Sequence, residues 1–530
     1  MKFPPLLILL PSLFLALLLH AKAEVKLPAI FADHMVLQRQ MPIVVWGSGA
    51  PGEKVAVDFS GNHVEATVDA SGSWRVELPA MEALVEGRTL SVRGSNTLTL
   101  NDVLVGEVWL CSGQSNMEWA LGRSEGGTNA CATTNPLLRL CTIPHNSQST
   151  PASEVNAKWV ISGDSSMKFF SAIGWWFGDK LQKELKVPVA IMNDSYGGTP
   201  IQAWMPVEAL KSGPWAHDDR WNNPEIARAE YERKKVAMQP AWDKYQADKA
   251  AAAQNRQPSP EPPKGWPGEY RGPGVLWNGM IHPLLPLRFR GVCWYQGENN
   301  SYVGIANTYS LMLPVMITEW RRAFGQPDLP FLIFQLARNR KPQTDPNEAS
   351  GIAVLQEAQL QTVAKTPHTA LIVTEDLGES DVHYKKKEPA AQRALNLALS
   401  QVYGRGGDAA CPAFKSIEIR GDQCMVSIDH AAGGMRAEGG APKGFTVAGE
   451  DRKFVFADAV IVGETVKVSS PQVMKPVAVR YAWADMPDVN VINAKGLPLS
   501  PFRTDNWPLP ETGGFSVTQP TPTPPPVAHP

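Results

Sequence analysis

Short apolar runs alternate with longer amphipathic stretches between residues 104 and 410, and this alternation restricts the possible fold more than any other feature. The runs "EVWL", "VPVAIM", "GVCWY", "FLIF" and "ALIV" are rich in β-branched and aromatic residues, as buried strands are. Stretches such as "SLMLPVMITEWRRAF" carry apolar residues at helical spacing. Strands that alternate with helices predict an α/β fold whose parallel sheet is buried on both faces. Such sheets bind ligands at the carboxyl ends of their strands.

The chain of 530 residues exceeds what one hydrophobic core usually supports, so we expect several domains. Residues 24–103 alternate apolar and polar positions between turn residues, which predicts an N-terminal β domain. Residues 411–510 repeat this pattern and predict a second β domain, after an α/β domain over 104–410. Residues 215–270 are rich in charge, alanine and proline, and they predict a helical insertion whose charges face solvent or whose helix serves as a lid.

A glycine pattern in the first β domain, G-x-G-x-x-G from Gly47 to Gly52, could suggest a dinucleotide site. It precedes another strand instead of a helix, and Pro51 lies inside it. We therefore expect a β-turn here and no nucleotide cofactor.

Both ends of the chain have compositions unlike the rest. Residues 1–23 combine Lys2 near the start, a short apolar stretch interrupted by Pro11, and a final A-x-A pattern, Ala21-Lys22-Ala23, which predicts a signal peptide cleaved after Ala23. An uncleaved membrane anchor is the alternative, but the apolar stretch is shorter than most membrane spans, which favours a cleaved signal. Residues 511–530 form a proline-rich tail. We expect a secreted or periplasmic protein with no membrane span after signal removal.

The formal net charge of -2 and the 19% of charged residues are those of an ordinary soluble globular protein, and they give no reason to expect a nucleic-acid partner. Six cysteines in an exported chain permit up to three disulfides, and Cys131 and Cys141 are spaced like a pair that closes a loop. Neither C-x-x-C nor H-E-x-x-H spacing occurs, so we expect no metal site. The sequence leaves the oligomeric state open.

The strand "VLVGEVWL" ends in "CSGQSNMEW", and Ser115 lies in a glycine-bearing turn where α/β hydrolases hold their nucleophile. The backbone N–H groups of such a turn can stabilise a developing oxyanion. Ser112 is the alternative serine, but it lies closer to the strand.

A serine nucleophile needs a general base that an acid holds in the right tautomer. His383 follows the last strand of the alternating region, with Asp376 and Asp381 nearby. The serine comes before the acid and the histidine along the chain, and hydrolases built on such sheets use this order. We therefore interpret His383 as the candidate base.

Two further loops at strand ends carry potential oxyanion donors. "NDSYGGTP" contains Gly197 and Gly198, and "WYQGENN" contains Gln296. A glycine N–H and a side-chain amide can both donate to charge that develops on oxygen. Four strand-end loops that bear a nucleophile, a base and two donors together favour a hydrolase.

The segments "NDVLVGEVWLCSGQSNMEW", "SYGGTPIQAW", "WNGMIHPL", "GVCWYQGEN" and "DVH" resemble the sialate O-acetylesterase family, a branch of the SGNH hydrolases. "FADHMVLQRQMPIVVWG" and "PLSPFRTDNWP" are also similar to that family, so the resemblance spans nearly the whole mature chain. It implies an SGNH-hydrolase-like three-layer αβα core with a parallel sheet, flanked by β-sandwich-like domains. It also implies a carbohydrate esterase that releases acetate from O-acetylated sugars without metal or cofactor.

The resemblance assigns roles to matching positions: Ser115 is the nucleophile, His383 the base, and Gly197 or Gly198 with Gln296 the oxyanion-hole donors. Many SGNH hydrolases have an acid three residues before the histidine, yet Ser380 occupies that place here. Asp381 lies two residues before His383, as the sialate branch tends to have, and is the preferred acid over Asp376 and Glu379. Tyr384 follows the histidine where the family tends to have proline.

Several alternatives remain open at this level. An acetyl esterase for plant polysaccharide such as xylan would use the same residues, and a sialate carboxylate would favour an arginine in the pocket. A non-catalytic carbohydrate-binding protein is the alternative of another class. The aromatic residues Trp119, Trp204, Trp294 and Tyr295 could stack on sugar faces or belong to the core. Glu298 could orient its loop through hydrogen bonds or titrate.

Overall fold

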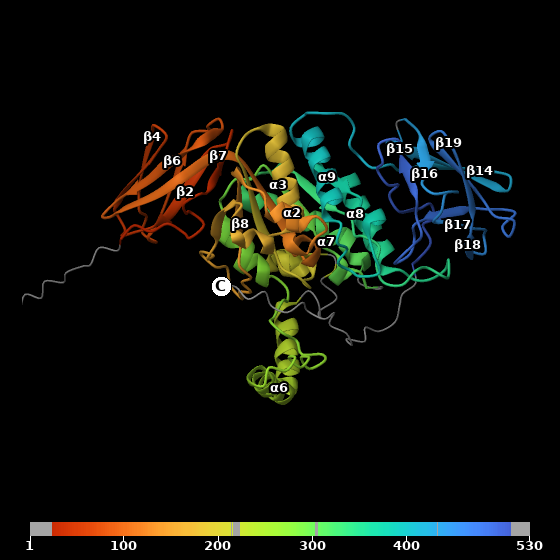
Figure 1. The fold of residues 1–530 in the computed structure, drawn as a ribbon, viewed down its shortest axis with the longest axis horizontal. Coiled ribbons are helices and arrows are strands. Elements are labelled where there is room, and N and C mark those ends of the chain that lie inside the picture. Colours follow the sequence, from red (N-terminus) through yellow and green to blue (C-terminus); the bar gives the residue numbers. More distant parts are fainter. Residues whose placement is uncertain (1–23, 214, 216–222, 303–305, 432, 510–530) are drawn as a thin grey trace, which may run out of the picture.

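The computed structural model describes residues 24–213, 215, 223–302, 306–431 and 433–509. The expected signal peptide and the proline-rich tail lie outside these residues. Figure 1 shows three units in a row: β-sheets of the N-terminal part, a central α/β unit, and β-sheets of the C-terminal part. The fold is therefore mixed α/β with additional antiparallel sheets, as expected from the sequence.

The central sheet has the strand order β13-β12-β11-β7-β10-β8-β9. Neighbours run parallel from β13 to β8, and only the edge strand β9 is antiparallel to its neighbour. Parallel strands need crossover connections, and the helices that supply them cover the sheet. The strands are β7 (Thr97–Gly113), β8 (Asn135–Thr142), β9 (Lys158–Ser162), β10 (Val189–Ser195), β11 (Gly291–Tyr295), β12 (Phe331–Phe334) and β13 (Thr369–Ile372).

Helices cover both faces of this sheet. Trp109 of β7 packs edge-on against Phe177 of α3, with ring centroids 5.0 Å apart. Trp294 of β11 pairs with Ser112, three positions further along β7, so it points to the opposite face. It contacts Trp320 of α7 there. The helices are α1 (Ser115–Glu118), α2 (Gly127–Cys131), α3 (Ala172–Leu185), α4 (Val207–Ser212), α7 (Ala306–Phe324), α8 (Gly351–Lys365) and α9 (Lys387–Leu397).

The N-terminal sheets are joined to the core through β7, which is 17 residues long. Its first half pairs antiparallel with β6, and its second half lies between β10 and β11. The predicted boundary between residues 103 and 104 therefore falls inside one strand. The glycine pattern begins with the last two residues of β2 and continues through the turn that leads to β3, so a strand follows it, as expected. The N-terminal strands are β1 (Val36–Gln38), β2 (Ile43–Ser48), β3 (Lys54–Phe59), β4 (Asn62–Thr67), β5 (Ser73–Leu78) and β6 (Leu84–Arg93).

The C-terminal unit has its own core of buried apolar residues between two four-stranded antiparallel sheets. Asp485 attaches this unit to the α/β unit by accepting hydrogen bonds from Arg340 Nη1 and Ser350 Oγ, at 2.9 and 2.6 Å. Its strands are β14 (Ala413–Arg420), β15 (Gln423–Asp429), β16 (Met435–Ala437), β17 (Phe445–Ala448), β18 (Phe454–Phe456), β19 (Asp458–Val462), β20 (Thr465–Ser469), β21 (Ala478–Tyr481), β22 (Val491–Asn493) and β23 (Phe502–Arg503).

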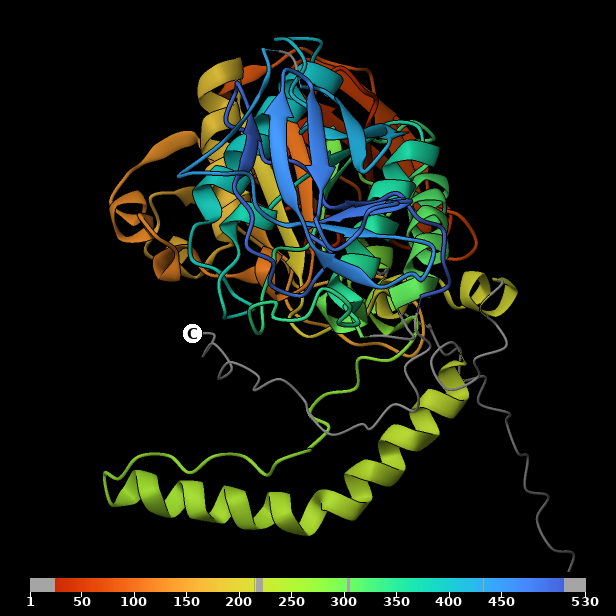
Figure 2. The ribbon, with the colours of Figure 1, turned by 90° about the vertical axis from the view of Figure 1, so that its right-hand side faces the viewer.

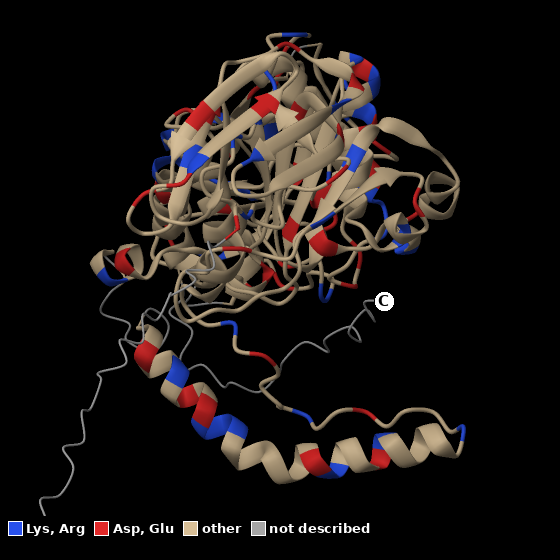
Figure 3. Ribbon diagram, turned by 90° about the vertical axis from the view of Figure 1, so that its left-hand side faces the viewer, with Lys and Arg blue, Asp and Glu red and all other residues tan. Residues whose placement is uncertain are grey.

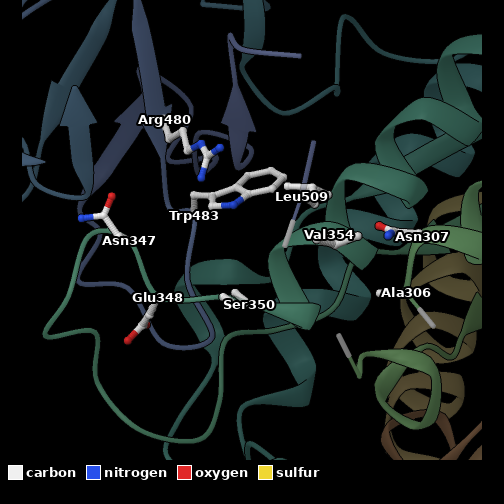
Figure 4. A pocket seen from close by; sticks show the side chains of 10 residues that line it. Ala306, Asn307, Asn347, Glu348, Ser350, Val354, Arg480, Trp483 and Leu509 are labelled. Atoms are coloured by element: carbon white, nitrogen blue, oxygen red, sulfur yellow. The ribbon is translucent and has the colours of Figure 1, made fainter. Parts of the chain in front are cut away.

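A pocket lies at this junction. Figure 4 shows Arg480 and Trp483 of the C-terminal unit on one side, with Val354 of α8 and Asn307 of α7 on the other. Neither Ser115 nor His383 lines it. The pocket is therefore separate from the predicted catalytic residues.

The segment expected to be a helical insertion contains α6 (Pro224–Gln254), which extends away from the body of the protein (Figure 2). None of the described residues of α6 is buried, and its charges of both signs are spread along it (Figure 3). The returning chain packs on the helix, where the Trp266 ring stacks on Trp242 with centroids 4.5 Å apart. No helix within the described ranges has both the length and the apolar composition needed to cross a membrane.

The proposed pairing of Cys131 with Cys141 is wrong, because all six cysteines are free thiols. Cys141 does not lie in a loop but on β8, where its side chain is fully buried opposite Met192 of β10. Cys131 ends α2 and is partly exposed. The two cysteines belong to different elements instead of closing one loop.

Candidate active site

Ser115 is the first residue of α1, immediately beyond the end of β7. Gly113 ends the strand with a φ of +132°, and a Cβ on it would lie 2.0 Å from the carbonyl oxygen of Tyr295. Only glycine allows this close approach of β7 and β11. The chain then turns at Gln114, and the first N–H groups of α1 have no partner within the helix.

Ser112, the alternative serine, occupies a different environment. It is completely buried in β7, next to Asp194 of β10 and Trp294 of β11. Its hydroxyl has no hydrogen-bond partner among the described residues. A substrate cannot reach a fully buried strand residue, so Ser115 is the accessible candidate.

The loop between β13 and α9 carries His383 and places Asp381 beside it. Asp381 Oδ1 accepts a hydrogen bond from the His383 backbone N–H at 2.9 Å and lies 3.7 Å from His383 Nδ1. The other two candidate acids are engaged elsewhere. Asp376 accepts two hydrogen bonds from Arg393, at 2.7 and 2.6 Å, and Glu379 lies 3.5 Å from the Lys385 backbone N–H.

The His383 ring is held between neighbouring groups near α1. The Trp119 ring stacks on it with centroids 5.0 Å apart and an interplanar angle of 21°. Its Nε2 is buried, and no described residue, Ser115 included, forms a hydrogen bond with it. Burial and the nearby positive charge of Lys387 lower the His383 pKa below its ordinary value of 6.5. The ring is therefore neutral at neutral pH, as a general base must be.

The glycine loop after β10 lies directly against Ser115. A Cβ added to Gly197 would lie 3.2 Å from Ser115 Cβ and 2.9 Å from Glu118 Oε2. The Gly197 N–H donates to that Glu118 oxygen at 2.6 Å. Gly198 adopts a φ of +69°, in the region that favours glycine. The structure thus brings the glycine loop to Ser115, with the Gly197 donor already engaged.

Replacing Gly197 with alanine is expected to lower kcat for acetyl-ester hydrolysis about 10- to 100-fold, because its methyl group would displace Ser115 or Glu118. The residue is partly exposed, so the melting temperature should change little. Steady-state kinetics and a thermal melt measure both effects. Gly407→Ala is a control for a glycine change elsewhere, because an added Cβ at Gly407 meets nothing within 4 Å and its φ is not positive. An unchanged kcat for Gly197→Ala would show that this loop does not shape the site.

Gln296 lies near Ser115 but uses its amide elsewhere. It is completely buried, and its Nε2 donates to Thr199 O, Asn300 Oδ1 and Gln114 Oε1 at 3.0, 2.8 and 3.2 Å. Its Oε1 accepts from the Tyr309 hydroxyl at 2.8 Å. In this arrangement Gln296 ties the loop after β11 to the neighbouring loops instead of presenting a free donor.

Most of the aromatic candidates for a sugar platform belong to the core. Trp204, Trp294 and Tyr295 are completely buried, so no sugar can stack on them. Trp119 is partly exposed, and the Arg123 guanidinium lies 4.1 Å from its ring centroid. Trp119 is therefore the one member of this group that lies at the site.

Sequence reasoning missed a group of polar side chains near Ser115, formed by Glu118, His145 and Arg271. Glu118 pairs with His145 Nε2 at 2.8 Å, and the His145 ring stacks on Tyr196 with centroids 3.6 Å apart. Arg271, at the end of the insertion, donates to the Gly197 carbonyl at 2.7 Å and lies over Tyr196. Glu118 shares a motif with Ser115, but no local pattern indicates His145 or Arg271.

Glu298, which the sequence offered as a loop-orienting or titrating residue, forms a group with Asn116 and Lys387, whose part in it sequence reasoning missed. The Asn116 side chain donates to the Glu298 carboxylate and accepts from Lys387 Nζ. Hydrogen bonding is thus the role that the structure gives Glu298. Within the described residues, no group of three or more His, Cys, Asp or Glu side chains could hold a metal ion.

Comparison with known proteins identifies similar chains. Residues 279–403 match the family described as carbohydrate esterase, sialic acid-specific acetylesterase. The sialate O-acetylesterases of Mus musculus and Homo sapiens are 29% and 28% identical over 440 and 433 residues, which cover 75% and 74% of this chain and 77% and 75% of theirs. The crystal structure of a carbohydrate acetylesterase from Xanthomonas citri is 34% identical, with a TM-score of 0.77, and the match covers 91% of this chain and 100% of that one.

Proposed function

Because the chain belongs to the sialate O-acetylesterase family and is a carboxylic ester hydrolase, we propose that it is an exported serine esterase that removes O-acetyl groups from sialic acid. The observation that carries the catalytic part is the position of Ser115 at the end of β7, against the glycine loop. The expected signal peptide supports export. Recovery of the protein outside the cytoplasm without residues 1–23 would test that part.

In the proposed mechanism, His383 takes the proton of Ser115 as Oγ attacks the acetyl carbonyl. Asp381 orients the imidazole and stabilises its protonated form. The backbone N–H groups of Ser115 and Gly198 donate to the oxyanion, while Gly197 and Gln296 position the loops around it. His383 then protonates the departing sugar alkoxide, and water hydrolyses the acetyl-enzyme by the same route.

The free His383 Nε2 is compatible with this mechanism. Catalytic hydrogen bonds are often long or unmade before substrate binds and shorten in the reacting complex. Trp119 stacks on one face of the ring, and the proposed bond forms when Ser115 Oγ and Nε2 come within reach in the substrate complex.

Arg271 supports sialic acid as the substrate class, because it places a cation beside the glycine loop and Ser115. The Arg271 side chain is partly exposed, so a bound sugar can reach its guanidinium group. Charge-assisted hydrogen bonds to a carboxylate contribute about 1.5–3 kcal/mol each. An anionic sugar offers Arg271 such a partner, and a neutral polysaccharide does not.

The substrate is tested by acetate release from O-acetylated sialic acid, acetylated xylan and a neutral chromogenic acetyl ester, with wild type and Arg271→Met. The variant should lose about 10- to 100-fold more kcat/KM on the sialic acid than on the neutral ester, because only the former has a carboxylate. Loss of the bond from Arg271 to the Gly197 carbonyl would slow the hydrolysis of all three substrates, and the loss measured on the neutral ester accounts for that effect. Arg233→Met on exposed α6 is the matched control. Preferred turnover of xylan, with equal losses on all three substrates, would favour a plant-polysaccharide esterase. No release by the folded wild type would favour a binding protein.

A further inference from the structure

The Asn116 side chain connects three loops that meet behind Ser115. Its Nδ2 donates to Glu298 in the loop after β11 and to the carbonyl oxygen of Val382, the latter at 3.0 Å. Its Oδ1 accepts from Lys387 Nζ, at the start of α9. Asn116 follows Ser115 in the chain, and Val382 precedes His383. One amide therefore joins the residues adjacent to the proposed nucleophile and base.

Lys387 is an unusual partner for this amide because it is completely buried. Its Nζ lies 3.6 Å from the centroid of the buried Tyr384 ring, which follows His383. Burying an ammonium group is unfavourable unless opposite charge and hydrogen bonds compensate it. Glu298 supplies the opposite charge, since both groups bond to the same amide.

The Asn116 amide is oriented as expected if Lys387 and Glu298 are both charged. The Asn116 carbonyl oxygen faces the ammonium group, and its amino group faces the carboxylate. Burial lowers the pKa of Lys387 to about 7 even though the negative charge of Glu298 opposes this shift, and burial raises the pKa of Glu298 against the opposing charge of Lys387. The three side chains thus stabilise one another as a unit.

Building on the proposed function, we propose that Lys387 is a positioning residue for the base, which holds the His383 loop against the Ser115 helix through Asn116 and Glu298. No described residue bonds to His383 Nε2, so the place of the ring relative to Ser115 depends on the stacked Trp119 ring and on the loop backbone that carries the histidine. The Asn116–Val382 bond and the Lys387–Tyr384 contact fix that backbone on both sides of the histidine.

Lys387 also sets the electrostatic environment of the ring. The charged groups that face His383 are Lys387, Asp381, Arg123 and Glu118, and those that face Lys387 are Glu298, Glu379 and Asp381. The positive charge of Lys387 disfavours the imidazolium form. In wild type, kcat/KM should therefore fall with decreasing pH only below 6.5, through the lowered pKa of His383. This fall of kcat/KM at low pH is the acid limb of the pH profile, and without Lys387 it should move to higher pH.

The experiment compares wild type, Lys387→Met, and the double variant Glu298→Gln with Lys387→Met. The single variant leaves a buried carboxylate without its cation, which destabilises folds, whereas the double variant removes both charges. In either folded variant we expect kcat to fall about 10- to 100-fold, because small displacements of a catalytic group have effects of this size. KM should stay within about threefold, because substrate contacts remain. The acid limb should also shift upward.

Lys386→Met is the matched control, since Lys386 is the exposed neighbour of Lys387 and should leave kcat and the acid limb unchanged. NMR titration of His383, assigned with His383→Asn, measures its pKa without any esterase activity. An upward shift in the folded double variant supports the proposal even if Ser115→Ala retains activity and the proposed function fails. An unshifted His383 titration with an unchanged kcat, or a fall in kcat matched only by loss of folded protein, would overturn it.

Discussion

Replacing Ser115 with alanine is expected to reduce kcat for acetyl-ester hydrolysis by about three to six orders of magnitude, because nucleophile and base act as a unit. The fold should be retained, since Ser115 is partly exposed. Acetate release under saturating substrate measures the loss. Mass spectrometry after a short reaction should find acetylated wild type and no acetylated variant.

Ser112→Ala is the matched control for this change. It removes a hydroxyl from a serine only three residues away, but that hydroxyl is buried and has no partner among the described residues. Loss of an unsatisfied buried hydroxyl is neutral or stabilising, and activity should stay at the wild-type level. If Ser112→Ala were inactive and Ser115→Ala active, the assignment of the nucleophile would be reversed.

His383→Ala should lower kcat by a similar three to six orders of magnitude, because in the proposed mechanism His383 takes the Ser115 proton and the two residues act as a unit. The truncated side chain leaves a space beside Trp119, against which the imidazole ring is stacked. Exogenous imidazole should therefore restore part of the activity. Stopped-flow measurements of acetate release with and without imidazole test both expectations.

His63→Ala is the control for the loss of an imidazole, because His63 is half-exposed on the N-terminal unit and pairs with Asp58 at 2.8 Å. It should retain full activity and show no response to imidazole. A His383→Ala variant with nearly full activity would assign the base to another residue, and His145 beside Glu118 would be the next candidate.

The fold was predictable because its strands and helices follow local periodicity. β7, β10, β11, β12 and β13 all coincide with apolar runs, and α7 and α9 coincide with amphipathic stretches. The position of Ser115 followed from the same logic, because the end of a strand and the start of a helix are both visible in the sequence. The misplaced cysteine pair arose because β8 was taken for a loop.

The polar groups around the site could not be predicted in the same way. Lys387 meets Asn116 across 271 positions of the chain, and Arg271 reaches the glycine loop from an insertion. The occupied amide of Gln296 depends on Gln114, Thr199 and Asn300 arriving together. Such contacts depend on tertiary packing, which single-sequence periodicity does not describe.

The continuity of β7 has a mechanical consequence. Its 17 residues form one strand, with N-terminal partners along its first half and the serine turn at its end. A hinge needs a flexible linker between two bodies, and here a single hydrogen-bonded strand takes its place. The N-terminal β unit therefore acts as a fixed extension of the catalytic frame, and removing it would truncate the strand whose second half leads to Ser115.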